Sequence, residues 1–101
     1  MSTAKLFSAL GDDTRLAVLA RLGEGPASIV GLTQGQAMSR QAVTKHLHVL
    51  EKAGLVRPAR AGRETLWSLQ RQRLDEARGF LEQMSQRWDD RLARLKLMVE
   101  D

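Results

Sequence analysis

The segment that most constrains the fold is residues 39–56, SRQAVTKHLHVLEKAGLV, because it joins a two-faced helix to a glycine break and a strand. Val43, Leu47 and Leu50 recur at four- and three-residue spacing and form one apolar stripe. Ser39 precedes this stripe and is a preferred N-cap residue. The pattern predicts a helix that begins after Ser39 and buries one face in a core.

The opposite face of this helix is polar and basic. It carries five side chains with hydrogen-bonding groups: Arg40, Gln41, Thr44, Lys45 and His48. A solvent-facing helix usually mixes Glu with Lys, but the first acid here is Glu51, at the far end. Arg and Lys reach guanine acceptors or phosphates, and Gln pairs with adenine, in the major groove of DNA. These five residues and Ser39 are candidate DNA contacts, although a solvated amphipathic helix explains this segment alone equally well.

A β-hairpin is predicted directly after the helix. Gly54 has the place of a left-handed C-cap, and a strand begins at residues 55–56. In residues 64–69, Thr65, Trp67 and Leu69 alternate with Leu66 and Ser68, which predicts a second strand after a turn near Gly62. Pro58 cannot donate a ladder hydrogen bond, so its strand must lie at an edge. The expected product is a protruding two-stranded wing.

Positive charge is concentrated on this helix and wing. Residues 40–63 contain six cations and one acid, a net charge of +5, whereas the whole chain carries +4. From residue 71 onward, seven cations balance seven acids. A localised basic surface concentrates the electric field and favours a polyanionic partner. The wing therefore adds three candidate DNA contacts: Arg57, Arg60 and Arg63.

A long apolar stripe runs through residues 73–100. Its members are spaced by three or four residues: Leu74, Ala77, Leu81, Met84, Trp88, Leu92, Leu95 and Val99. A single helix of this length would rise about 40 Å at about 1.5 Å per residue, farther than so small a domain extends. We predict that the stripe packs on its own core as far as Met84 and meets a second subunit beyond Trp88. Gly79 is one position where the helix could bend.

Composition limits the other options. The 101 residues suit one domain, in which residues 1–70 would bind DNA and residues 71–101 would dimerise. The chain has two Trp, two Phe and no Tyr, so it lacks the stacking surfaces of single-strand binders, and duplex DNA is preferred over RNA. Apolar runs are too short for a membrane span or a signal peptide, which predicts a cytoplasmic protein without a membrane partner.

Parts for catalysis or metal binding are scarce. There is no cysteine, no phosphate-binding glycine loop and no nucleophile elbow. His46 and His48 lie two apart on the helix, about 200° around its axis, and cannot share a metal. His46 is expected to pack in the core, and one of Asp12 and Asp13 to cap a helix. We predict a protein that is not an enzyme and has no metal or other cofactor.

The order of these elements resembles the winged helix-turn-helix domain of the ArsR family of bacterial transcriptional repressors, over roughly residues 5–70. Three segments carry the resemblance: LGDDTRLAVLARL at 10–22, residues 39–56, and GRETLWSL at 62–69. They are similar to the family's Leu-Gly-Asp-x-Thr-Arg motif, its recognition helix and its Gly-Arg wing. The implied fold is mainly α with a small β-hairpin wing, and the implied protein is a homodimeric repressor on a near-palindromic operator.

The resemblance also implies dimerisation through the first and last helices. The first is expected over residues 3–10. The interface residues expected from both helices are Leu6, Phe7, Leu10, Leu81, Met84, Trp88, Leu92 and Leu95. Residues 28–36, where relatives place a cysteine site, read SIVGLTQGQ and offer no soft metal ligand. Near the other metal site of the family, Asp75, Glu76 and Glu82 have no histidine close in sequence.

The helix that should support the recognition helix departs from the family pattern. A break at residues 23–26 precedes Ile29, Val30 and Leu32, and Gly31 and Gly35 would each cost about 1 kcal/mol relative to Ala in a helix interior. A short or mobile helix is expected here.

Two other functions stay open: a protein-interaction module whose C-terminal stripe binds a different protein, and a regulator with an unknown small-molecule effector between the Trp88 region and the first helix.

Overall fold

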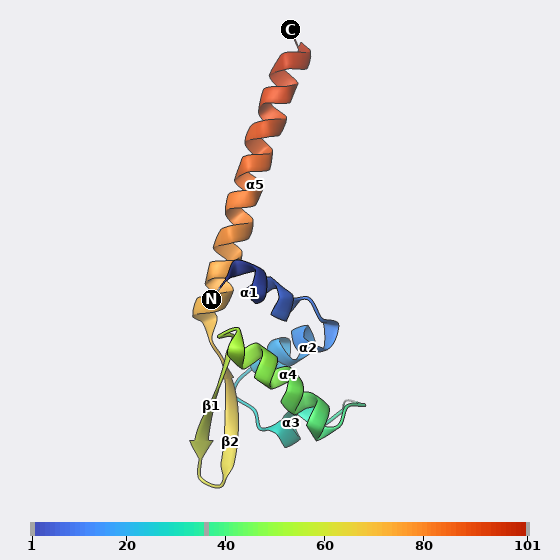
Figure 1. Cartoon of the computed structure of the whole chain (residues 1–101), viewed down its shortest axis with the longest axis vertical. Helices are drawn as coiled ribbons and strands as arrows, with labels where there is room; N and C mark the ends of the chain where they lie inside the picture. Colours follow the sequence, from blue (N-terminus) through green and yellow to red (C-terminus); the bar gives the residue numbers. More distant parts are fainter. Residues whose placement is uncertain (1, 36, 101) are drawn as a thin grey trace.

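The computed structural model describes residues 2–35 and 37–100. In these residues the elements follow the order α1 Thr3–Leu10, α2 Asp13–Leu22, α3 Ile29–Thr33, α4 Arg40–Lys52, β1 Val56–Ala61, β2 Glu64–Leu69 and α5 Arg71–Glu100. The first six form a body from which α5 projects (Figure 1). The molecule measures 69 × 26 × 22 Å, and its radius of gyration of 18.4 Å exceeds the value of about 13 Å typical of a compact chain this long.

Side chains cap the first four helices. At each N-terminus a Ser or Asp oxygen accepts the backbone N–H three residues later: Ser2 from Lys5, Asp12 from Arg15, Ser28 from Gly31, and Ser39 from Ala42, at 3.0–3.2 Å. The predicted caps at Ser39 and Asp12 are therefore confirmed. The Arg15 N–H lowers the pKa of the Asp12 carboxyl below its usual value, with smaller contributions from the charges of Arg15 and His46.

Arg15 ties the end of α1 to the start of α2. Its Nε donates to the Ala9 carbonyl at 2.7 Å and its Nη2 to the Ser8 carbonyl at 3.2 Å. Carbonyls in the last turn of a helix have no partner inside the helix, so a cation that binds them stabilises that end. This contact fixes α1 against the body at the point where the chain turns at Gly11.

The core lies between α1, α2, α3, α4 and the base of the hairpin. Its largest fully buried side chains are Leu6, Val18, Leu32, Val43, Leu47, Leu50 and Leu55. The predicted α4 stripe is confirmed, since Val43, Leu47 and Leu50 are all inaccessible. Leu6 corrects an expectation: it is only 1% exposed inside its own protomer, so it leaves no surface for the dimer contact that the resemblance implied.

The wing is the predicted antiparallel hairpin. Val56 pairs with Leu69 at its base and Ala61 with Glu64 at its tip, and the turn contains Gly62 at φ 65°. Ala27 adds a short bridge beside β2, because its N–H and carbonyl exchange hydrogen bonds of 3.0 and 2.8 Å with Trp67. The hairpin is thus joined to the segment that leads into α3.

Helix α3 is short, as expected, but for a partly different reason. It ends at Thr33, whose hydroxyl donates to the Val30 carbonyl at 2.8 Å. Gly31 lies inside the helix, whereas Gly35 lies beyond its end at φ 76°. The expectation that Gly35 occupies a helix interior is therefore wrong, because the chain has already turned there.

Helix α5 runs without interruption through Gly79 and on past Asp89 and Asp90. Ala77 is buried and Leu74 half-buried against the body, and the Phe80 ring lies 5.5 Å from that of Phe7 on α1. Packing on the body ends earlier than the sequence suggested, because Leu81 is 54% and Met84 42% exposed. No helix among the described residues has the length and hydropathy needed to cross a membrane.

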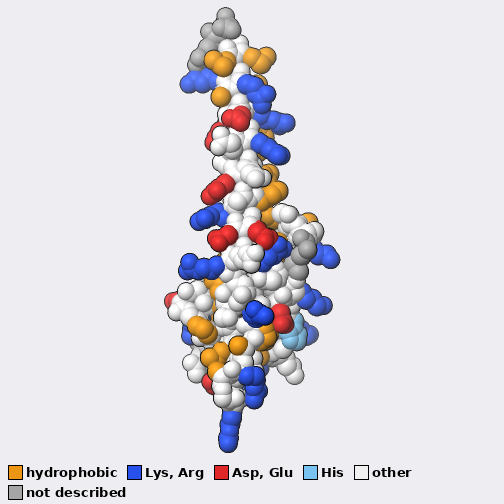
Figure 2. Space-filling model, turned by 90° about the vertical axis from the view of Figure 1, so that its left-hand side faces the viewer, with side chains coloured by type: hydrophobic (Ala, Val, Ile, Leu, Met, Phe, Trp, Pro, Cys, Tyr) orange, Lys and Arg blue, Asp and Glu red, His pale blue; other side chains and the backbone are white. Residues whose placement is uncertain are grey.

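From Leu81 onward α5 projects from the body, and in this free part of the helix the large apolar side chains are exposed. Figure 2 shows apolar atoms along one side of the projecting helix, with charged side chains around them. Trp88, Leu92 and Leu95 are each more than half exposed. Large exposed apolar stripes of this kind mark association surfaces.

The turn after α4 generates the first prediction. Gly54 has φ 76°, and a Cβ there would lie 3.1 Å from Cγ of Arg73, whereas Gly35 has the same φ with open space around it. Gly54→Ala should lower the free energy of unfolding by about 1–2 kcal/mol from left-handed strain, and further because of the contact with Arg73. Gly35→Ala should show the strain alone. Urea unfolding of both variants measures the difference, and equal losses would contradict the close contact.

Candidate nucleic-acid interface

The exposed face of α4 is the first half of the candidate interface. Arg40, Gln41, Lys45 and His48 are exposed, as the amphipathic pattern predicted. Thr44 is half-buried, and its hydroxyl donates to the Arg40 carbonyl at 2.8 Å. That hydroxyl proton is engaged within the helix, so Thr44 has only its oxygen lone pairs to offer a ligand.

The candidate contact Ser39 and the expected core residue His46 both have structural roles. The Ser39 hydroxyl accepts the Ala42 N–H at 3.2 Å and so sets the start of the helix. His46 is half-buried rather than fully packed, at the border between the core stripe and the open face. It is close enough to Asp12 of the α2 cap to help lower the pKa of that carboxyl, a proximity that residue spacing could not reveal.

The wing presents its three arginines in different directions. All are exposed, but Arg57 pairs with Ser68 and Arg60 with Thr65, three positions apart along β1. Successive side chains of a strand point to opposite faces, so Arg57 and Arg60 lie on opposite faces of the hairpin. Arg63 follows Gly62 at the tip. The strand register places Arg57 near the base of the wing, farther from the tip than Arg60 and Arg63.

The two halves are placed by the same core. Helix α3 packs against α4, and α4 packs against β1, so the buried stripe of α4 sets the direction of its open face. Figure 1 shows the wing tip and the start of α4 at the end of the molecule remote from the C-terminal end of α5. Figure 2 shows Lys and Arg side chains at the wing end. The arrangement offers cations on a helix and on a neighbouring hairpin, which is a geometry that binds duplex nucleic acid.

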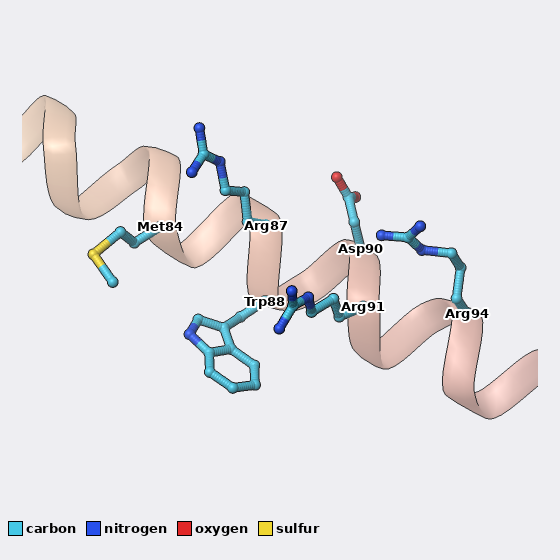
Figure 3. Close-up of a pocket in the computed structure, with 6 residues that line it drawn as sticks. All are labelled: Met84, Arg87, Trp88, Asp90, Arg91 and Arg94. Atoms are coloured by element: carbon cyan, nitrogen blue, oxygen red, sulfur yellow. The ribbon is translucent and has the colours of Figure 1, made fainter.

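The surface of α5 has a shallow hollow around Trp88. It is lined by residues of α5: Met84, Arg87, Trp88, Asp90, Arg91 and Arg94. Figure 3 shows Met84, Trp88 and Arg91 on one side of the helix, with Asp90 on the other. The Arg91 guanidinium carbon lies 5.9 Å from the centre of the Trp88 ring, in a cation–π contact. A hollow on one helix does not enclose a ligand, and α1 does not line it, so the protomer forms no closed effector pocket here.

Metal ligands do not gather in the described part of the chain. Its His, Asp and Glu residues form no group of three or more that could hold an ion. Two arginines were missed by the sequence reasoning: Arg15, which binds the end of α1, and Arg73, which binds the end of α4. Both act on backbone carbonyls of another element, and charge patterns along the chain carry no signal for such contacts.

Comparison with known proteins agrees with this architecture. Residues 10–59 match the family model described as a helix-turn-helix domain. Over 68 residues the chain is 38% identical to the HTH-type transcriptional regulator Rv2034 of Mycobacterium tuberculosis, an alignment that covers 67% of this chain and 64% of that protein. The chain thus spans less than two thirds of the length of this relative.

Solved structures extend the likeness to nearly the whole chain. An ArsR-like transcriptional regulator from Rhodococcus sp. RHA1 has a TM-score of 0.84 and 37% identity, and the match covers 94% of this chain and 90% of that one. A domain of Mb0332 from Mycobacterium bovis, described as a homodimeric winged helix-turn-helix DNA-binding domain, has a TM-score of 0.67 at 19% identity, with 82% of this chain and 77% of that one covered. At that identity the second likeness concerns the fold.

Proposed function

This chain belongs to the ArsR family of winged helix-turn-helix transcriptional regulators, and we propose that it binds duplex DNA as a homodimer and regulates the promoter it occupies. The observation that carries the proposal is the division of α4 into an inaccessible apolar stripe and an exposed basic face beside an arginine-bearing wing. Such a surface suits phosphates and the acceptor edges of bases. The protein would act in the cytoplasm, because the promoter DNA that it is proposed to bind lies there.

The mode of binding follows from the geometry of α4 and the wing. The N-terminal half of α4, from Ser39 to His48, enters the major groove, while Arg60 and Arg63 reach the flanking backbone or minor groove. Two copies related by a twofold axis place their helices in successive major grooves about 34 Å apart, on a near-palindromic operator. Repression, by exclusion of polymerase, is proposed from the family resemblance.

The free stripe of α5 supports the homodimer. Trp88, Leu92 and Leu95 are 57–58% exposed, and they continue the stripe that Leu74 and Ala77 bury against the body. In a twofold dimer each copy offers the same surface, so the stripes of both copies are covered together. Phe7 and Leu10 of α1 are only half-buried and remain candidates for the same interface, together with Leu81 and Met84.

The cations of the interface should set its salt dependence. Lys45→Ala and Arg63→Ala should weaken binding to operator and random duplex alike, and each should reduce the slope of log K against log salt by about one unit. Arg94→Ala is the matched control, because it removes a cation from the free part of α5. Operator is first selected from a random duplex pool, and titrations over a salt series follow. Slopes unchanged by Lys45→Ala or Arg63→Ala would contradict the proposed contacts.

Gln41 should act on bases rather than on charge. If its amide pairs with a base edge, Gln41→Ala should lower discrimination at one operator position by about 1–3 kcal/mol. The salt slope should stay that of the unmodified protein, because no cation is lost. Competition between operators that differ at single positions measures this discrimination. A variant that keeps the full base preference would show that Gln41 reads no base.

The dimer should depend on one face of α5. Trp88→Asp should shift the protein from dimer to monomer and weaken operator binding, since a carboxylate in an apolar interface lacks a partner. Leu97→Asp is the control: Leu97 is also exposed, at 66%, but nine residues along a helix it points to the opposite side. Sedimentation at several concentrations reports the mass. A Trp88→Asp variant that stays dimeric would place the interface elsewhere.

A further inference from the structure

Arg73 connects the first turn of α5 to the end of α4. Its Nε donates to the Ala53 carbonyl at 3.1 Å, and Ala53 is the C-cap residue of α4. Its Nη1 forms an ion pair with the Glu76 carboxylate, which orients the guanidinium from within α5. The Arg73 side chain is only 19% exposed. A charged side chain of the projecting helix is therefore held against the backbone that ends α4.

Gly54 provides the space for this contact. A Cβ on Gly54 would lie 3.1 Å from Cγ, 3.4 Å from Cδ and 3.5 Å from Nε of Arg73. The stem of Arg73 therefore lies directly against the backbone of the left-handed cap residue. The same turn continues into the core, because the Leu55 N–H donates to the Leu50 carbonyl at 2.9 Å. The end of α4 and the position of Arg73 are thus fixed by one tightly packed joint.

A favourable and an unfavourable energetic contribution meet at this joint. The carbonyls at the C-terminus of a helix carry partial negative charge, and a guanidinium that binds one of them is stabilised by it. The Nη2 atom of Arg73 is buried without a hydrogen-bond partner, which costs desolvation free energy. The other contacts of the Arg73 side chain offset this cost. Apart from this joint, the main helical neighbour of α5 is α1, not α4. The joint is therefore a direct bridge between the DNA-reading helix and the helix that carries the association stripe.

We propose that Arg73 is a positioning residue that fixes the orientation of α4 relative to α5, and so sets the spacing between the two recognition helices of the dimer. The inference rests on the proposed function, because spacing has meaning only for a dimer that binds two half-sites. Arg73 does not contact DNA in this arrangement. Its contribution is to make the bound geometry present before DNA arrives, which favours the operator with matching half-site separation.

The test compares Arg73→Gln with Arg71→Gln, which removes the same charge from the same turn of α5 at an exposed position. Each protein is titrated against the selected operator and against duplexes with one to three base pairs inserted between the half-sites. Arg73→Gln should bind the operator about tenfold more weakly, a loss within the usual range of coupling between distinct sites. It should also discriminate less against the duplexes with insertions. Arg71→Gln should keep the spacing preference of the unmodified protein.

Other results have distinct meanings. If Arg73→Gln binds all duplexes with the same spacing preference as Arg71→Gln, the positioning role is overturned. If the unmodified protein binds no duplex, the proposed function fails, whatever Arg73 does. Should Arg73→Gln fail to fold by circular dichroism, Arg73→Lys decides, because one ammonium cannot reproduce the planar contact to Ala53 and Glu76 together. A Lys variant that folds and keeps full spacing discrimination overturns the proposal.

Discussion

Burial of the apolar stripe of α4 is the constraint on which the rest of the structure depends. Val43, Leu47 and Leu50 have no accessible surface, and burying each such side chain is worth about 1.5–3 kcal/mol. Rotation of α4 about its axis would bring these side chains into water, so the helix has one stable orientation. The basic face then points outward because the apolar face points inward. Interface geometry here is a consequence of core packing.

Helix α5 presents the opposite situation, since its own protomer covers only the start of its stripe. Ala77 is buried, yet Trp88 and the apolar residues after it remain in solvent. The charges of the segment balance, so electrostatic repulsion between two copies is weaker than it would be for the basic wing and α4. The end formed by α4 and the wing is suited to a polyanion, and the end formed by α5 is suited to a second apolar surface. A DNA-binding dimer requires both kinds of surface.

Much of the fold could be predicted from local sequence signals. The features that could not be predicted depend on how the elements pack together. The cap at Ser39, the left-handed Gly54 and the turn at Gly62 depend on a few neighbouring residues, and all three were confirmed. The burial of Leu6, the early exposure of Leu81 and the opposite faces of Arg57 and Arg60 depend on which element packs where and on strand register. The DNA contacts themselves stay predictions drawn from the residue types on α4 and the wing.

The joint at Ala53 and Gly54 lies at the C-terminal end of α4, whereas the candidate DNA contacts lie on the N-terminal half of this helix. Helix α4 has 13 residues and is about 20 Å long at about 1.5 Å per residue. A rotation of the whole body by about 10° relative to α5, centred on this joint, would move the far end of α4 by about 3.5 Å, close to the rise of about 3.4 Å per base along one DNA strand. Such a rotation shifts the contacts at the N-terminus of α4 by about one base and the contacts nearer the joint by less. Helix α5 can therefore influence DNA recognition through a small change at Arg73, with no need for a large movement of the body.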